Sequence, residues 1–175
     1  MDAGRKGEPM SLGRTTLERT SDREIVITRT FRAPAQIVFD AWTRPEYVKR
    51  WWASRSRGVT LVVCDADLRP GGLYRYVLAR GEAQRFAFSG RYIEIARPTR
   101  LVYTQNFEPV PDREAVVTVS FEEEDGSTRL VAHELYPSKK ALDDTLASGM
   151  EDGMRETFDQ LDELVAELDT GGLAR

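Results

Sequence analysis

The side chains that most often carry out chemistry are scarce in this chain, which has a single histidine, His133, and a single cysteine, Cys64. A histidine can serve as a general base near neutral pH, and a cysteine beside such a base can serve as a nucleophile. A Cys64–His133 dyad would require both side chains to face one cavity. The motifs G-x-x-x-x-G-K-[ST], G-x-S-x-G, H-E-x-x-H and C-x-x-C are missing from the sequence, so no catalytic motif indicates an enzyme.

Two further features have simple structural explanations. The run Asp65-Ala66-Asp67 could form a metal-binding pair, but a polar strand end beside a turn explains it better. Cys64 follows two valines, and such a setting is typical of a small buried cysteine rather than a reactive one. Neither feature indicates a metal or another cofactor, and we expect none.

Glu134 is the carboxylate whose position matters most. Apolar and polar residues alternate over residues 128–135, so Leu130, Ala132 and Glu134 share one face of a predicted strand and His133 lies on the other. A carboxylate among apolar groups is costly unless it is paired. The residues that could supply the polar end of a pocket are Tyr74, Tyr76, Tyr92, Tyr103 and Gln105.

The elements that position these residues follow from hydrophobic periodicity. A strand over residues 24–31 precedes two short helices, and six more strands lead to a long helix that we expect to end at Gly171-Gly172. Successive strands with short turns predict a curved antiparallel sheet of about seven strands, and hence an α+β fold. The six strands are predicted over residues 59–65, 73–79, 84–95, 101–107, 116–121 and 128–135.

Special residues mark several local features. Thr43 and Glu46 form a capping-box pattern, which predicts a break between the two short helices. In the strand over residues 84–95 the apolar residues change face just after Gly90, which predicts a bulge there. Gly149 and Gly153 are spaced i,i+4 in the predicted long helix, where each glycine costs about 1 kcal/mol relative to alanine. These glycines either let the helix approach the sheet closely or leave space that the flexible Met150 and Met154 border.

The 175 residues suit one domain with tails. We expect a flexible tail over residues 1–22, a domain over residues 23–169 and a C-terminal tail over residues 170–175; either Met1 or Met10 could be the start of translation. No apolar run reaches the roughly 18 residues of a membrane helix, and residues 1–16 lack the apolar core of a secretory signal. These patterns favour a cytoplasmic protein that does not insert into membranes.

Charge is distributed unevenly around a net value of −4. Basic residues are in excess over residues 23–113, and acidic residues are in excess over residues 114–175. The simplest interpretation is that the two halves neutralise each other within one domain. Because the basic residues are spread out rather than clustered, we expect no nucleic-acid partner.

Taken in order, the elements resemble the helix-grip fold of the START-like superfamily, also called SRPBCC or birch-pollen-allergen-like. The local motifs resemble those of bacterial homologues of the activator of heat-shock-protein-90 ATPase. The similar segments are APAQIVFDAWTRPEYVKRWW, DLRPGG, SGRYIEIARPTRLVYT and VTVSFEEEDGSTRLVAHE, and the resemblance extends over about residues 23–168. The family usually has Gly-Trp early in the last helix, where this chain has Gly153-Met154.

The resemblance implies a cavity between the sheet and the long helix, with Trp51 and Trp52 at the end that the two short helices close. It also implies that the face carrying Leu130 is the inner one, which places Glu134 inside and His133 in solvent. The residues that we expect to bind a ligand are Trp51, Tyr74, Tyr76, Phe88, Tyr103, Gln105, Glu134, Met150, Gly153 and Met154.

Three functions are compatible with this resemblance. The first is binding of a small apolar or amphipathic molecule, which predicts an apolar cavity with one polar end. The second is an enzyme of the polyketide cyclase or aromatase kind that uses Glu134 and Tyr103, which predicts convergent buried ionisable groups. The third is a chaperone partner, which predicts a large exposed apolar patch. The third ranks last, because that activity belongs to relatives with several domains.

Overall fold

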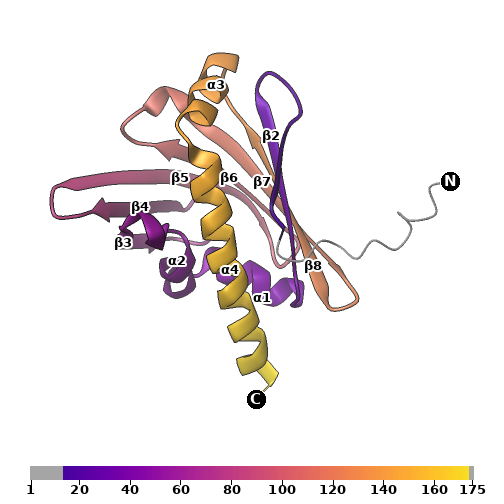
Figure 1. The fold of residues 1–175 in the computed structure, drawn as a ribbon. Helices are drawn as coiled ribbons and strands as arrows, with labels where there is room; N and C mark the ends of the chain where they lie inside the picture. The colour runs from indigo at the N-terminus through magenta and orange to yellow at the C-terminus, as the bar shows by residue number, and fades with distance from the viewer. Residues whose placement is uncertain (1–13, 174–175) are drawn as a thin grey trace.

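The computed structural model describes residues 14–173, which form one curved antiparallel sheet of eight strands and four α-helices (Figure 1). The strands are β1 (Thr16–Arg19), β2 (Glu24–Phe31), β3 (Val59–Ala66), β4 (Leu73–Arg80), β5 (Gln84–Ala96), β6 (Arg100–Phe107), β7 (Ala115–Glu124) and β8 (Ser127–Leu135). The helices are α1 (Ala35–Thr43), α2 (Pro45–Trp51), α3 (Lys139–Ala147) and α4 (Met150–Leu173), with single 3₁₀ turns η1 (Arg55–Arg57) and η2 (Pro111–Arg113).

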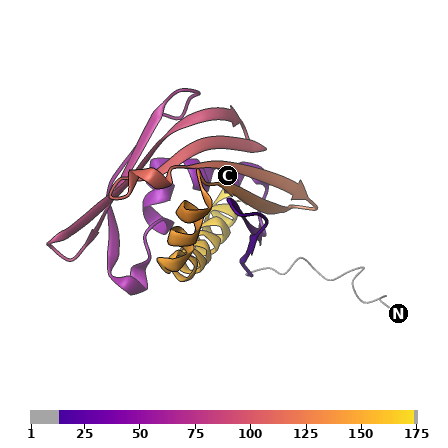
Figure 2. The ribbon, with the colours of Figure 1, turned by 90° about the horizontal axis from the view of Figure 1, so that it is seen from above.

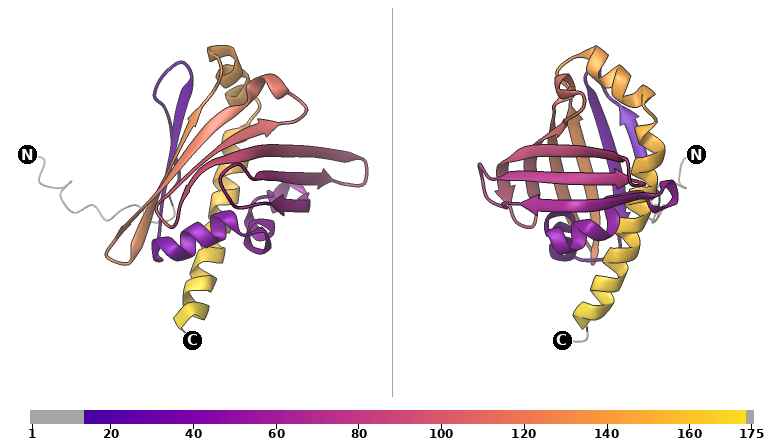
Figure 3. Two further views of the ribbon diagram at one scale, coloured as in Figure 1. Left: turned by 180° about the vertical axis from the view of Figure 1, so that it is seen from behind. Right: turned by 90° about the vertical axis from the view of Figure 1, so that its left-hand side faces the viewer.

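The strand order is β1-β2-β8-β7-β6-β5-β4-β3, so β1 and β3 form the two edges of the sheet. Seen from above, the sheet bends over α4, which runs along its concave side (Figure 2). Helices α1 and α2 lie together at one end of the sheet beside α4, and α3 lies at the other end (Figures 1 and 3). The predicted α+β helix-grip fold is therefore confirmed. No helix within residues 14–173 combines the length and apolar character needed to cross a membrane.

The core lies between the inner face of the sheet and the apolar side of α4. Alternation along β2 and β8 buries Ile25, Ile27 and Leu130, each at most 2% exposed. On α4, Phe158, Leu161, Leu164 and Val165 recur at helical spacing and are buried against the sheet. Burial of this stripe holds the helix across the concave face.

The break between α1 and α2 is present, but its cause differs from the predicted capping box. Arg44, not Thr43, is the N-cap of α2, with an extended backbone and no capping side chain. A residue before proline favours this extended conformation, and Pro45 suits the first helical position. Thr43 instead ends α1, where its hydroxyl donates to the Phe39 carbonyl at 2.8 Å.

Three elements differ from the sequence-based expectation. Four residues of the predicted N-terminal tail form β1, which pairs with β2 and is an edge strand of the sheet. Residues 1–13 of that tail lie outside the described residues. Helix α3 was not predicted, because its stretch over residues 139–147 is short and mostly polar. Helix α4 continues through Gly171 to Leu173 because Gly171 keeps a helical backbone, so the predicted stop at Gly171-Gly172 is wrong.

Gly149 lies outside the long helix. Its φ of +81° places it in the left-handed region, immediately after Ser148, the C-cap residue of α3. Glycine is favoured at this position because it lacks the Cβ that makes the conformation costly. The prediction that Gly149 belongs to the long helix is therefore wrong, since Gly149 separates α3 from α4.

The predicted bulge in β5 is present slightly beyond Gly90, where the register against β6 shifts between Tyr92 and Glu94. It turns Tyr92 inward and leaves Ile93 46% exposed. Gly90 has a separate role, since a Cβ there would lie 1.8 Å from the Thr104 carbonyl oxygen. The glycine thus allows β6 to approach closely.

Ion pairs join the basic and acidic parts of the chain. Arg29 of β2 contacts Asp159 at 2.5 Å and Asp162 at 3.2 Å, both on α4. Arg55 of η1 lies 3.2 Å from Glu163 on the same helix. These pairs place basic side chains of the first part against acidic side chains of the second, as the charge interpretation expects.

Candidate functional site

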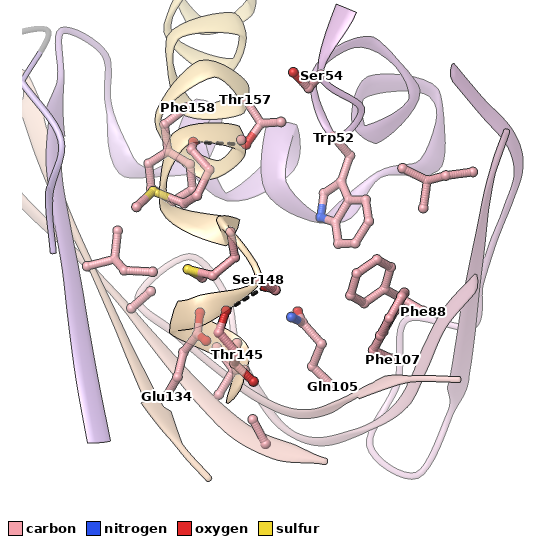
Figure 4. Close-up of a pocket in the computed structure, with 18 of the residues that line it drawn as sticks. Trp52, Ser54, Phe88, Gln105, Phe107, Glu134, Thr145, Ser148, Thr157 and Phe158 are labelled. Atoms are coloured by element: carbon pink, nitrogen blue, oxygen red, sulfur yellow. Dashed lines mark hydrogen bonds between the residues drawn. The ribbon is translucent and has the colours of Figure 1, made fainter. Parts of the chain in front are cut away.

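A cavity of about 440 Å³ lies between α4 and the inner face of the sheet (Figure 4). Its side walls come from β4, β5 and the segment after α2, and the strands β6, β7 and β8 form its floor. All of the residues expected to bind a ligand line this cavity except Tyr74 and Tyr76. A concave, mostly apolar cavity of this size is typical of sites that bind small molecules.

One wall of the cavity is aromatic. The Trp52 ring meets the Phe88 ring edge to face, with centroids 4.9 Å apart, and Phe88 lies 4.9 Å from Phe107 (Figure 4). Such contacts fix ring orientation, because aromatic rings prefer offset or edge-to-face arrangements. Trp52 is partly exposed and faces the cavity, whereas Trp51 is only 2% exposed and its indole N–H donates to the Ala41 carbonyl at 2.8 Å. Trp52 is thus part of the cavity wall, and Trp51 is part of the core that borders the cavity.

The segment that carries Trp52 is tied to α4 by hydrogen bonds from two side chains of the helix. The Gln160 amide donates to the carbonyl oxygens of Trp51 at 2.9 Å and Ala53 at 2.7 Å. Glu156 accepts hydrogen bonds from the Ser56 backbone N–H at 2.8 Å and from the hydroxyls of Ser54 and Ser56. This wall is therefore anchored to the helix on the opposite side of the cavity.

The polar end of the cavity is built around Glu134. This carboxyl is 8% exposed and accepts a hydrogen bond from the Tyr136 hydroxyl at 2.7 Å. Burial raises the pKa of Glu134 above its ordinary value, and the hydrogen bond from Tyr136 offsets only part of that effect. Protonation is therefore easier here than on an exposed glutamate.

The tyrosines near Glu134 are uncharged donors at neutral pH. Burial, followed by the nearby Glu134 charge, raises the pKa of Tyr103 and of Tyr136 well above the usual range. Gln105 extends from β6 toward the centre of the cavity (Figure 4). A carboxyl and two phenols thus lie at one end of a mostly apolar space, and the Gln105 amide lies nearer its centre.

Met150, Gly153 and Met154 of α4 line the side of the cavity opposite the sheet. A Cβ at Gly153 would meet only the Arg57 guanidinium, with its nearest atom 3.9 Å away. That is an ordinary van der Waals distance, so Gly153 leaves room rather than allowing a close helix–sheet contact. The structure therefore supports the explanation that Gly153 leaves space beside the helix.

Tyr74 and Tyr76 lie behind the aromatic wall. They line a separate pocket of about 20 Å³, and the Tyr76 ring packs edge to face on Trp52 with centroids 5.1 Å apart. The Tyr74 hydroxyl is already used, since it donates to the Thr104 carbonyl at 2.7 Å. Both tyrosines are at most 6% exposed and belong to the core rather than to the lining of the main cavity.

Several cavity residues were missed from the sequence. Tyr136 continues the alternation of β8 beyond the predicted strand end, so the pattern Leu130, Ala132, Glu134 could have identified it. Arg113 sits in η2, whose sequence carries no periodic signal. The other missed residues with polar side chains are Ser54, Thr145, Ser148 and Thr157.

His133 and Cys64 cannot form a dyad. The His133 side chain is 43% exposed on the outer face of β8, with Nε2 2.8 Å from a Glu24 oxygen. Cys64 is buried on the edge strand β3, and burial raises the pKa of its thiol to about 11. The predicted solvent-facing histidine and core cysteine are both confirmed. Among residues 14–173, no three His, Cys, Asp or Glu side chains are grouped to hold a metal ion.

Comparison with known families agrees with this architecture. A family profile described as Activator of Hsp90 ATPase homolog 1-like protein matches residues 32–166. The chain therefore belongs to this family, a bacterial branch of the START-like (SRPBCC) superfamily, whose members commonly bind ligands. No curated protein matches the sequence.

Solved bacterial structures share the fold at low sequence identity. A crystal structure from Rhodobacter sphaeroides is similar at 26% identity, with a TM-score of 0.82 over 88% of this chain and 99% of that one. A Staphylococcus epidermidis protein has 26% identity and a TM-score of 0.74 over 87% of this chain and 94% of that one. A Mycobacterium smegmatis protein has 25% identity and a TM-score of 0.75 over 86% of this chain and 96% of that one.

Proposed function

We propose that the protein binds a small apolar or amphipathic molecule in the cavity between α4 and the sheet. The observation that carries this proposal is the cavity of about 440 Å³, with an aromatic wall on one side and the buried Glu134 carboxyl at one end. Burying apolar ligand surface contributes about 25 cal/mol per Å² before the costs of association. The polar end orients the ligand, and no cofactor is needed.

Native mass spectrometry of the purified protein tests this proposal. We expect a fraction of the protein to carry a copurified small molecule that is released on denaturation. Gly153→Leu fills the cavity from α4 and should remove the adduct. Gly171→Leu provides the matched control, because Gly171 lies on the exposed part of the same helix and a Cβ added there would meet no neighbouring atom within 4 Å. Its adduct should persist, and an adduct that survives equally in both variants would place the ligand elsewhere.

A second function is favoured by the chemistry of the polar end. Glu134, Tyr103 and Tyr136 converge on the cavity, and a buried carboxyl with a raised pKa holds a proton more readily than an exposed glutamate, as a general acid requires. This arrangement supports a reaction of the polyketide cyclase or aromatase kind. If the protein is such an enzyme, Glu134→Gln should abolish turnover of a bound polyketide while leaving its binding within about tenfold. Equal turnover in the variant would exclude this role for Glu134.

A chaperone-partner function has less support. The exposed large apolar residues within residues 14–173 are Val62, Leu73, Ile93 and Val116. They lie on separate strands, β3, β4, β5 and β7, and none exceeds 67% exposure. Single exposed apolar residues are ordinary for a protein surface, so they do not favour a docking patch.

A further inference from the structure

The polar end of the cavity has the shape of a slot. In the sheet register, Val117 of β7 pairs with Tyr103 of β6 on one side and with Glu134 of β8 on the other. Ala115 pairs with Gln105 in the next row of the same face. Because adjacent strands are about 4.8 Å apart, the backbones of β6 and β8 lie roughly 10 Å apart. The small side chains between them leave a floor on which a ligand head can lie.

Hydrogen-bonding capacity remains open on both sides of this slot. One Glu134 oxygen, Oε1, accepts from Tyr136, and no donor within residues 14–173 reaches the other oxygen, Oε2. The Gln105 amide has no hydrogen-bond partner within the same residues, and it points into the cavity (Figure 4). A ligand that hydrogen-bonds with both groups therefore gains affinity over one that leaves them unpaired.

We infer, on the basis of the proposed function, that the slot selects a ligand whose polar head is a hydroxyl group, as in a phenol or an alcohol. The hydroxyl donates to Glu134 Oε2 and accepts from the Gln105 amide N–H, so one small neutral group satisfies both sides. The rest of the ligand lies against the aromatic wall formed by Trp52, Phe88 and Phe107.

The same geometry disfavours a carboxylate head. A ligand carboxylate in the slot would face the Glu134 carboxyl, and when both groups are ionised their like charges repel and the free Glu134 oxygen can only accept. Arg113 also lines the cavity, but its guanidinium lies 4.0 Å from Asp144, which already balances part of its charge. Glu134 is therefore the residue that distinguishes hydroxyl compounds from fatty or aromatic acids.

Binding of three matched probes to the wild-type protein tests this inference. The probes are a naphthol, its methyl ether and the corresponding naphthoic acid, each titrated at neutral pH by isothermal calorimetry. The ether keeps the ring and loses the donated hydrogen bond, so it should bind roughly tenfold or more weakly than the naphthol. The naphthoate should bind more weakly than the ether.

Glu134→Gln sharpens the test without changing the size of the side chain. Tyr136 continues to donate to the amide oxygen, which turns the amide NH₂ toward the slot. The naphthol should then lose its advantage, and the naphthoate should gain at least tenfold relative to it. Glu122→Gln is the control, because Glu122 of β7 does not line the cavity and is half-exposed beside Arg129. This variant should keep the wild-type ranking.

The outcomes distinguish the hydroxyl inference from the proposed function. Equal affinity for all three probes in the wild type would overturn the hydroxyl inference and leave the proposed function standing. A ranking that is the same in wild type and Glu134→Gln would also overturn it. If none of the probes binds and no compound in a wider panel does, the proposed function fails, and the inference fails with it.

Discussion

The Tyr136 hydroxyl donates a 2.7 Å hydrogen bond to the Glu134 carboxyl at the inner end of the cavity. The two residues lie on the same face, because they are two positions apart at the end of β8. Their contact holds one carboxyl oxygen in place, and no donor within residues 14–173 reaches the other. The charge state of this single buried carboxyl therefore influences both stability and binding.

Glu134 should make the protein less stable as the pH rises. Because burial raises the pKa of Glu134 in the folded state above its ordinary value of 4.5, the folded state binds this proton more tightly than the unfolded state does. Its stabilising contribution is fully present below pH 4.5 and is lost as the pH rises through the folded-state pKa. Denaturant titrations at a series of pH values test this. As the pH rises from 4.5 through the folded-state pKa, the free energy of unfolding of Glu134→Gln should increase relative to that of wild type.

Tyr136→Phe provides the second arm of that experiment. The variant removes the hydrogen bond that lowers the pKa of Glu134, so the loss of stability should extend to higher pH than in wild type. If the stability of Glu134→Gln relative to wild type instead falls as the pH rises, Glu134 is ionised and well paired in the folded protein.

Arg29 should respond asymmetrically to substitution. Its side chain is 2% exposed on the inner face of β2, while its partners Asp159 and Asp162 are 64% and 41% exposed. Converting both aspartates to asparagine leaves a buried cation without a counter-charge and should cost about 3–5 kcal/mol. Arg29→Met removes the buried charge itself and leaves two solvated carboxylates, so it should cost clearly less.

Chemical denaturation of both variants measures this difference. Arg55→Met is the surface control, because Arg55 and its partner Glu163 are 63% and 72% exposed, and it should stay within about 0.5 kcal/mol of wild type. A larger loss for Arg29→Met than for the double asparagine variant would contradict the assignment of Arg29 as a buried cation that depends on α4.

His133 should be dispensable. Its imidazole lies on the outer face of β8 beside Glu24, and an exposed pair of this kind contributes little. His133→Ala should change the free energy of unfolding by about 0.5 kcal/mol or less and should leave ligand affinity unchanged. A hundredfold fall in affinity or turnover would show that His133 acts in the site after all.

Much of the fold could be predicted because burial imposes simple periods. Alternation placed Leu130, Ala132 and Glu134 on one face, and the resemblance identified that face as the inner one. Alternation could not separate Tyr76 from Phe88, since both point inward. The Trp52 ring packs against both Tyr76 and Phe88. The position of this ring depends on how the segment after α2 packs against α4.

Residue spacing alone also could not distinguish the roles of the two glycines in the last helical region. Gly149 and Gly153 are four positions apart, which indicates one helix face if the helix is continuous. Helix α3 ends at Ala147 and α4 starts at Met150, so Gly149 lies in the turn between the two helices and Gly153 borders the cavity. Only the packing of α3 at the far end of the sheet distinguishes these roles, and its short polar sequence gave no sign of it.

The most direct test of the cavity is the ligand-dependent melting temperature of Gly153→Leu and Gly171→Leu, measured with the tightest compound from a screen of aromatic and aliphatic molecules. At one hundred times its dissociation constant, the compound should stabilise wild type and Gly171→Leu by about 2.7 kcal/mol, a shift of roughly 5–11 °C. Gly153→Leu should fold, melt no lower than Gly171→Leu without ligand, and lose the shift. A full ligand shift in Gly153→Leu, or its destabilisation by about 1–3 kcal/mol through overpacking, would contradict the account.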